Sequence, residues 1–180
     1  MGEKPVLSKP DLLRGIAVSA VAAVAILALL VQLQAFGYKY AFSLPAKLQM
    51  FIVWLLAIPA AYFYMRSRLS KAWVLKTFAP LAIATTALGL SLLLLYDSFM
   101  GLELIILGYF FEPIAGISIY LTVKRYGLAS LLFFLGAVAY TAGLPLYLYD
   151  FGYLSIIGDS VKLAGLLALV RLLGGEGPNR

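Results

Sequence analysis

Long apolar segments alternate with short polar or aromatic segments along the whole chain. Six of the apolar segments are long enough to cross a bilayer, because a transmembrane helix needs about 20 predominantly apolar residues. Their approximate limits are 15–33, 49–65, 77–96, 99–123, 128–149 and 153–173. The pattern predicts an all-α integral membrane protein, a bundle of about six transmembrane helices that forms a single domain over residues 1–180.

The first apolar segment has a competing explanation, since Ala22, Ala23 and Ala25 are small residues of the kind that precede a signal-peptide cleavage site. The apolar core of a signal peptide is only about 7–15 residues long. The segment from about Gly15 to Leu33 is longer than that. We therefore expect it to remain in the protein as a membrane helix.

Lysine and arginine residues are unevenly distributed between the two sets of loops. With a cytoplasmic N-terminus, only Lys39 and Lys47 lie outside. Eleven lie on the cytoplasmic side: Lys4, Lys9, Arg14, Arg66, Arg68, Lys71, Lys76, Lys124, Arg125, Arg171 and Arg180. Cytoplasmic loops carry an excess of Lys and Arg, so we expect both termini in the cytoplasm and the protein in the plasma membrane.

Composition agrees with a membrane protein and excludes several kinds of chemistry. Hydrophobic residues make up 63% of the chain and charged residues 12%, against about 25% charged residues in soluble domains. The net charge of +6 resides at the ends of the spans, where it contacts lipid headgroups, so no nucleic-acid partner is expected. A single Asn and three Gln fit a thermophilic source.

The chain contains no cysteine and no histidine. Disulfides, thiolate metal sites, iron–sulfur clusters, histidine-ligated haem and Ser-His-Asp catalysis are therefore excluded within it. We predict no cofactor, no metal site and no catalytic residue, and an enzymatic role is the less favoured interpretation.

Glu112 is the most informative acidic residue because it lies near the middle of the fourth span. It follows Phe99 by 13 residues, which corresponds to about 20 Å along a helix axis. Gly108 and Gly116 lie four residues before and after it, and small residues at this spacing let another helix backbone approach closely. We therefore expect Glu112 to point into the bundle, where an ionisable residue indicates a functional site.

Lys162 lies at a similar depth in the sixth span, nine residues after Tyr153. Asp159 precedes it by three residues, so the two side chains share one helix face and can pair. We expect Lys162 to face Glu112 from the opposite helix. With all three groups ionised, the cluster carries one net negative charge, which makes it a natural acceptor for a proton or a cation.

Pro113 follows Glu112 directly and has no N–H to donate to the carbonyl of Tyr109. That carbonyl oxygen is therefore available to a water molecule, a cation or a side chain. We predict an ion- or solute-binding site formed by Glu112, Lys162, Asp159 and Tyr109, with Pro113 as a hinge.

Two resemblances to known families are visible. In length, span number and an alanine-rich first span, the chain resembles the substrate-binding membrane components of energy-coupling-factor vitamin transporters, although no specific motif is shared. The string from Gly158 to Leu163 is similar to the Gly-Asp-Val-Lys-Leu stretch of prepilin-type intramembrane aspartyl peptidases. Ser160 interrupts it and the second catalytic aspartate is missing, and catalysis by such a pair needs two carboxylates at one site. Neither resemblance assigns a family.

Three functions remain open from the sequence. The leading hypothesis is a small polytopic membrane protein that binds or transports an ion or small solute. The first alternative is a non-catalytic subunit or assembly factor of a larger complex, in which the small-residue face of Gly15, Ser19 and Ala23 packs against a protein partner or a second copy of the chain. The second alternative is a membrane-embedded lipid-modifying enzyme with a buried acid as general acid.

Overall fold

The computed structural model describes residues 9–149 and 151–175. Within these residues the chain is all-helical and has no strand. Three short 3₁₀ helices, η1 (Tyr38–Phe42), η2 (Lys124–Tyr126) and η3 (Leu144–Tyr149), lie between the longer ones. The α-helices are α1 (Lys9–Phe36), α2 (Leu44–Arg66), α3 (Ala72–Tyr96), α4 (Phe99–Val123), α5 (Leu128–Gly143) and α6 (Tyr153–Gly175).

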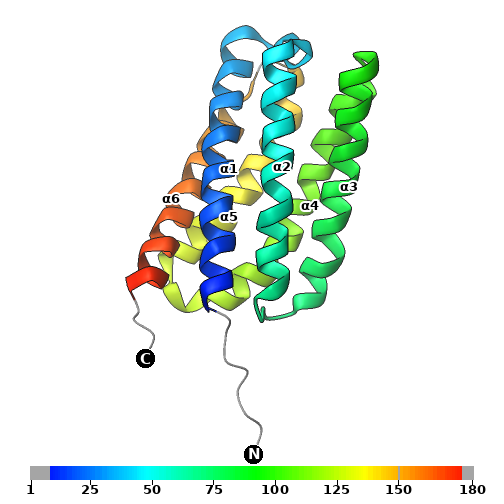
Figure 1. Ribbon diagram of the computed structural model, residues 1–180. Helices are drawn as coiled ribbons and strands as arrows, with labels where there is room; N and C mark the ends of the chain where they lie inside the picture. Colours follow the sequence, from blue (N-terminus) through cyan, green and yellow to red (C-terminus); the bar gives the residue numbers. More distant parts are fainter. Residues whose placement is uncertain (1–8, 150, 176–180) are drawn as a thin grey trace, which may run out of the picture.

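The helices form a closed ring. Each one packs against its neighbours along the chain, and α1 also packs against α6. Successive helices run in opposite directions, so α1 begins and α6 ends at the same end of the bundle (Figure 1). We call this end the basic end, because nine of the described Lys and Arg residues lie there: Lys9, Arg14, Arg66, Arg68, Lys71, Lys76, Lys124, Arg125 and Arg171. The opposite end carries Lys39 and Lys47.

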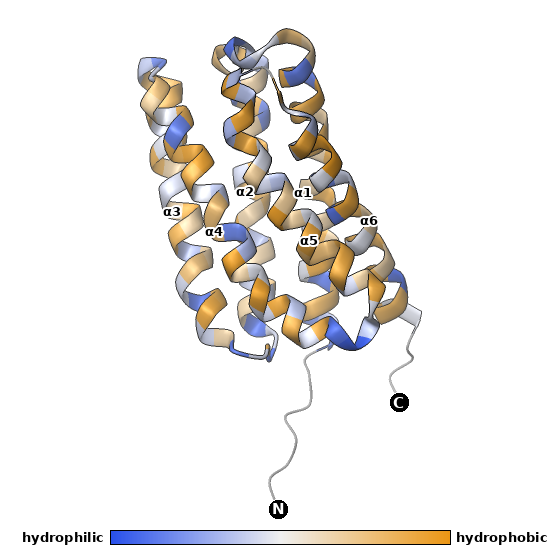
Figure 2. Cartoon of the chain, turned by 180° about the vertical axis from the view of Figure 1, so that it is seen from behind, coloured by the Kyte–Doolittle hydropathy of each residue, from blue (hydrophilic) through white to orange (hydrophobic). Residues whose placement is uncertain are grey.

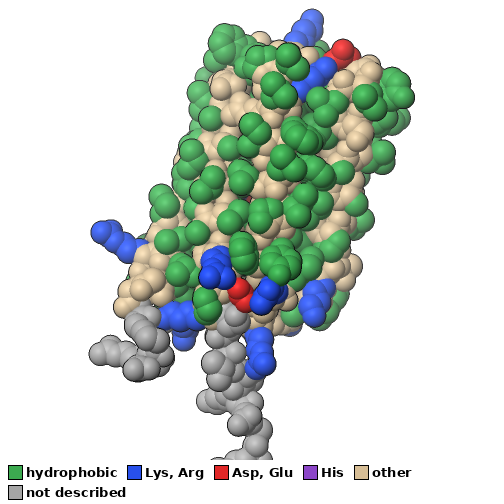
Figure 3. Space-filling model, in the orientation of Figure 1, with side chains coloured by type: hydrophobic (Ala, Val, Ile, Leu, Met, Phe, Trp, Pro, Cys, Tyr) green, Lys and Arg blue, Asp and Glu red, His purple; other side chains and the backbone are tan. Residues whose placement is uncertain are grey.

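The outside of the bundle is apolar between these two ends. Large side chains such as Ile52, Leu88 and Leu135 are more than half exposed to the surroundings. Hydrophobic positions extend along the helices, while hydrophilic ones gather mainly at the ends (Figures 2 and 3). Such a surface is suited to lipid and not to water.

Five helices of the described chain, α1 to α5, are long and apolar enough to cross a membrane when η2 and η3 are counted with α4 and α5. The predicted all-helical bundle is confirmed, and its long apolar helices support a place in a membrane. The sixth predicted span corresponds to α6, which carries Asp159 and Lys162 and is not one of the five.

Several predicted boundaries shift for local reasons. α2 begins at Leu44 and not near residue 49, because the hydroxyl oxygen of Ser43 accepts a hydrogen bond from the Ala46 N–H at 3.4 Å and caps the helix. The predicted span 128–149 divides into α5 and η3 next to Pro145, which lacks the N–H that an α-helix needs. α6 continues two residues past the predicted limit, to Gly175.

Glycines bring two helix pairs into direct backbone contact. A Cβ atom added at Gly158 or Gly136 would overlap the backbone of the partner helix in the α5–α6 pair. In the α3–α4 pair, a Cβ at Gly89 would lie 2.6 Å from the carbonyl oxygen of Gly101, and the reverse holds for Gly101. These are the two most extensively packed pairs of the ring, and each carries one partner of the central ion pair described below.

Two buried apolar clusters close the ends of the ring. Near the basic end, Leu12, Ile16, Leu75 and Leu169 are at most 2% exposed. Near the opposite end, Leu30, Leu93, Ile105 and Tyr147 form part of the second cluster. Charged and polar side chains occupy the interior between them.

Candidate functional site

Glu112, Asp159 and Lys162 meet inside the ring. The ammonium Nζ of Lys162 donates a hydrogen bond to Glu112 Oε1 at 3.2 Å and lies 2.9 Å from Asp159 Oδ1. Glu112 is on α4 and Lys162 on α6, two helices that are not neighbours in the ring. The ion pair therefore crosses the interior.

The three charged side chains differ sharply in exposure. Glu112 is 38% exposed, whereas Lys162 is 3% and Asp159 0% exposed. Neither carboxylate oxygen of Asp159 receives a well-oriented hydrogen bond from the described residues. Its only charged partner among them is the Lys162 ammonium, so Asp159 depends on Lys162 for charge compensation.

Lys162 has a third partner in the ring of Tyr140. Its ammonium lies 4.4 Å from the ring centroid, within the range of a cation–π interaction. Tyr140 is 1% exposed and belongs to α5. Its carbonyl oxygen accepts a hydrogen bond from the Ser155 hydroxyl at 2.9 Å, which ties α6 to α5 one turn before Asp159. Lys162 is therefore held by α4, α5 and α6 together.

A cavity of about 160 Å³ adjoins this cluster and is lined by residues from all six α-helices. About 10–15 Å³ of such space holds one water molecule, so the cavity accommodates about 11–16 waters or a small solute. Alanine and glycine supply ten of its 24 lining residues: Ala22, Ala57, Ala60, Ala61, Ala79, Ala82, Ala115, Ala137, Gly108 and Gly116. The cavity exists because these side chains are too short to fill the ring.

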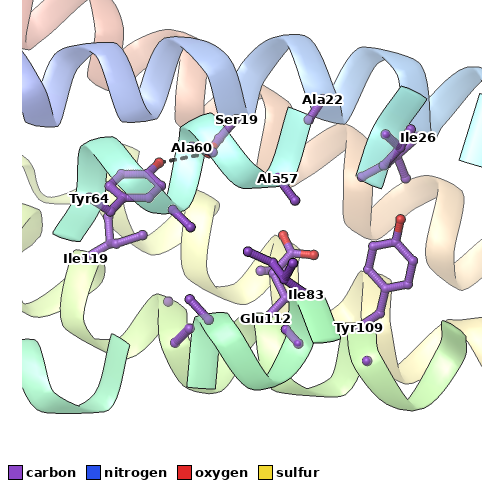
Figure 4. Close-up of a pocket in the computed structure, with 18 of the residues that line it drawn as sticks. Ser19, Ala22, Ile26, Ala57, Ala60, Tyr64, Ile83, Tyr109, Glu112 and Ile119 are labelled. Atoms are coloured by element: carbon purple, nitrogen blue, oxygen red, sulfur yellow. Dashed lines mark hydrogen bonds between the residues drawn. The ribbon is translucent and has the colours of Figure 1, made fainter. Parts of the chain in front are cut away.

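The carboxylate of Glu112 points into this space between two tyrosines, Tyr64 and Tyr109 (Figure 4). The hydroxyl groups of Tyr64 and Ser19 are hydrogen-bonded at 2.9 Å. Trp54 also lines the cavity, and its indole N–H donates to the carbonyl oxygen of Ile83 at 3.1 Å. The Glu112 carboxylate is therefore the charged group that the cavity exposes most.

A second, smaller cavity of about 60 Å³ lies toward the opposite end. Ile26 and Tyr109 line both cavities, so they form the boundary between them. The Tyr109 ring packs edge-on against Tyr140, with centroids 5.7 Å apart. This contact links the boundary to the residue that holds Lys162.

The sequence-predicted site residues thus occupy distinct positions. Glu112, Lys162 and Tyr109 line the cavity, and Asp159 lies behind Lys162. Pro113 is within α4, which continues through it.

The predicted close approach of a backbone at Gly116 is wrong. The nearest atom to an added Cβ there is on the Phe133 ring at 3.8 Å. Only Gly108 packs tightly, against Thr86 of α3. Gly116 instead contributes open space to the cavity.

Four polar cavity residues escaped the sequence-based site: Ser19, Trp54, Tyr64 and Thr86. Each is a polar residue inside an apolar helix, which is the sequence signal that could have found it. The signal is weak because none of these residues carries a formal charge. The small-residue pattern of α1 was a signal for two of these residues. Gly15 packs against the ring of Tyr64, and the Ser19 hydroxyl is hydrogen-bonded to the Tyr64 hydroxyl.

No group of three or more His, Cys, Asp or Glu side chains within the described residues is arranged to hold a metal ion. Comparisons of the chain with protein-family models, curated proteins and solved structures found no match. The function must therefore be argued from the cavity and its charges.

Proposed function

We propose that this protein is a plasma-membrane bundle of six transmembrane helices, with both termini in the cytoplasm, that binds an ion or small solute in its central cavity and transports it. One observation carries the proposal. An ionisable carboxylate near the middle of α4, 38% exposed, faces a cavity bounded by all six helices. Such a group inside an otherwise apolar bundle is costly to keep and marks ion pathways and solute sites.

α6 completes the proposed set of spans. It has 23 residues, or about 34 Å of helix, and packs against α5 and α1 as a member of the ring. Its two central charges compensate each other and face inward, with Asp159 0% and Lys162 3% exposed. Inward pairing lowers the cost of carrying charges through the hydrocarbon layer.

Each residue of the cluster has a separate role in this proposal. Glu112 takes up the proton or cation. Lys162 holds the Glu112 side chain in position when the cavity is empty. Asp159 remains the charged partner of the Lys162 ammonium when the Glu112 carboxylate binds a guest. Pro113 supplies backbone flexibility next to Glu112, because it cannot donate to the Tyr109 carbonyl.

The subunit hypothesis has less support. It depended on small-residue faces being available to a partner, yet the face of Gly15 and Ser19 packs inside the bundle against Tyr64. The glycines of α5 and α6 pack against each other's helices. A lipid-modifying activity has no observation in its favour beyond the acid Glu112 itself, and no group of the described acidic residues is arranged to hold a metal ion.

Transport can be tested in vesicles that contain the purified protein and an internal pH indicator. Salts of Na⁺, K⁺ and a series of organic cations are added under an imposed pH gradient. We expect at least one salt to dissipate the gradient with the wild-type protein and with Glu103→Gln, because Glu103 is exposed on the outside of α4. Glu112→Gln should abolish the signal while the protein still folds. If no salt gives a signal that depends on Glu112, the proposed function is wrong.

A further inference from the structure

We infer that the central cavity takes a small organic monocation, of the alkyl- or arylammonium class, in exchange for one proton on Glu112. The inference rests on the proposed function and specifies its substrate and its stoichiometry. Three observations carry it: which charge faces the cavity, what else lines the cavity, and how the charges sum in each state.

The cavity presents negative charge to a guest. Glu112 is 38% exposed, whereas the Lys162 side chain is only 3% exposed. The Lys162 ammonium is also compensated without Glu112, since Asp159 Oδ1 lies 2.9 Å away and the Tyr140 ring centroid 4.4 Å away. A cation can therefore bind Glu112 without leaving a buried ammonium unpaired.

The remaining lining suits an organic cation better than a bare metal ion. Ca²⁺ and Mg²⁺ need about six or more oxygen ligands, and the lining supplies a single carboxylate. Two of its hydroxyl groups, those of Ser19 and Tyr64, are already bonded to each other. Alanine and glycine surfaces together with the rings of Trp54, Tyr64, Tyr109 and Phe133 instead match the apolar body of an ammonium compound, and aromatic rings attract its charge.

Size sets a further limit on the guest. The cavity of about 160 Å³ has room for about 11–16 waters at about 10–15 Å³ each, which corresponds to an ammonium compound with about a dozen non-hydrogen atoms. Ile26 and Tyr109 separate this space from the smaller cavity beyond.

Charge accounting gives the exchange ratio. The groups that surround Glu112 are Lys162 and Asp159 of α6 and the neutral tyrosines Tyr64, Tyr109 and Tyr140. With Glu112 protonated, the cluster sums to zero, because Lys162 and Asp159 cancel. With Glu112 ionised and paired with a monocation, the sum is again zero. The empty ionised state carries one negative charge that neither a proton nor a guest cation balances.

The binding step therefore exchanges one cation for one proton. The guest cation forms an ion pair with the Glu112 carboxylate, and the proton that leaves the carboxyl oxygen passes to water. No other bond changes. Because the occupied and protonated forms carry the same charge, transport by this step is electroneutral and does not respond to membrane voltage.

The test uses the purified full-length protein in weakly buffered detergent solution at mildly acidic pH. Methylammonium, tetramethylammonium and benzylammonium chloride are compared with sodium chloride at equal ionic strength and with benzyl alcohol as the neutral counterpart of benzylammonium. Proton release is followed with a pH indicator, and the thermal unfolding midpoint is measured in parallel. We expect at least one ammonium salt to release one proton per protein and to raise the midpoint.

Neither sodium chloride nor benzyl alcohol should produce these effects. Glu112→Gln should remove both effects, and Glu103→Gln should retain them. Equal proton release by sodium chloride would overturn the inference while leaving a cation site at Glu112, and hence the proposed function, in place. Stabilisation by an ammonium salt that persists in Glu112→Gln would place the guest elsewhere and overturn the inference. Absence of any effect from all three ammonium salts on the folded wild-type protein would overturn it as well, and the vesicle assay then decides whether the proposed function survives with another ion.

Discussion

Gly136 of α5 lies directly against the backbone of Lys162 on α6, so close that a Cβ at this glycine would overlap the Lys162 nitrogen. The position of the buried ammonium is thus set by a residue that has no side chain. We expect Gly136→Ala to destabilise the protein by about 1–3 kcal/mol, the usual cost of overpacking, and to weaken every activity that depends on the charge cluster.

Thermal unfolding in detergent measures the effect of Gly136→Ala. Gly174→Ala is the matched control, since an added Cβ there meets no atom within 4 Å. Equal unfolding midpoints for the two variants would contradict the close contact between Gly136 and the Lys162 backbone.

Lys162→Met should be the most destabilising single change in the cluster. It leaves Asp159, which is 0% exposed, without its charged partner, and breaking a buried ion pair from one side costs about 3–5 kcal/mol. Asp159→Asn should cost less, because Lys162 keeps Glu112 as a partner. Chemical denaturation of both single variants and of the double variant gives the coupling energy. A double variant whose destabilisation equals the sum of the two single effects would show that the two residues are independent.

A cysteine in the cavity should react preferentially with a cationic reagent. The chain has no cysteine, so Ala57→Cys introduces a single thiol into the cavity that Glu112 also lines (Figure 4). We expect the cationic reagent ethylammonium methanethiosulfonate to react faster than its anionic sulfonate analogue. The ratio of the two reaction rates should be larger at position 57 than with a free thiol in solution. Adding Glu112→Gln should return the ratio to the free-thiol value.

Leu135→Cys provides the control for cavity access, because Leu135 is 52% exposed on the apolar outside of α5. In the proposed membrane this thiol contacts lipid and does not ionise, so it should react slowly. Reaction at position 57 no faster than at position 135 would mean that water and reagent do not reach the cavity.

Tyr109 should control passage between the two cavities that it borders. Tyr109→Ala removes the ring and joins the two spaces, so we expect a several-fold faster dissipation of a pH gradient in vesicles. Tyr109→Phe keeps the ring and its edge-on contact with Tyr140, and it should behave nearly as the wild type does. If the alanine variant is no faster than the phenylalanine variant, the boundary is not the barrier.

Membrane orientation can be checked with two exposed lysines at opposite ends of the bundle. Lys39 lies in η1 and Lys124 in η2. With cytoplasmic termini, a membrane-impermeant maleimide should label Lys39→Cys in intact cells. Lys124→Cys should react only after the membrane is permeabilised. The reverse pattern would invert the proposed topology.

The helices and the charged pair were accessible to sequence reasoning because each leaves a one-dimensional signal. Apolar runs define helix positions, and Glu112 and Lys162 stand out as charges within such runs. Helix ends were less accessible, since they depend on local hydrogen bonding such as the Ser43 cap of α2. The break after Gly143 follows the same rule, with Pro145 as the residue that cannot donate.

The cavity was not accessible in this way, because it results from how six helices close on one another. Ala57 and Gly116 are ordinary small residues in the sequence, and only the ring arrangement makes them face a common space. Tyr64 illustrates the same limit. Its hydroxyl reaches Ser19, 45 positions away in the chain, and no local pattern encodes that distance.

The central ion pair connects the two glycine-packed helix pairs. Glu112 moves with α4 and hence with the α3–α4 hairpin, whereas Lys162 moves with the α5–α6 hairpin. The 3.2 Å contact between them is an electrostatic attraction between the two hairpins. In the proposed transport cycle, protonating Glu112 or pairing it with a guest removes that attraction, so a change at one oxygen atom releases the two hairpins from each other.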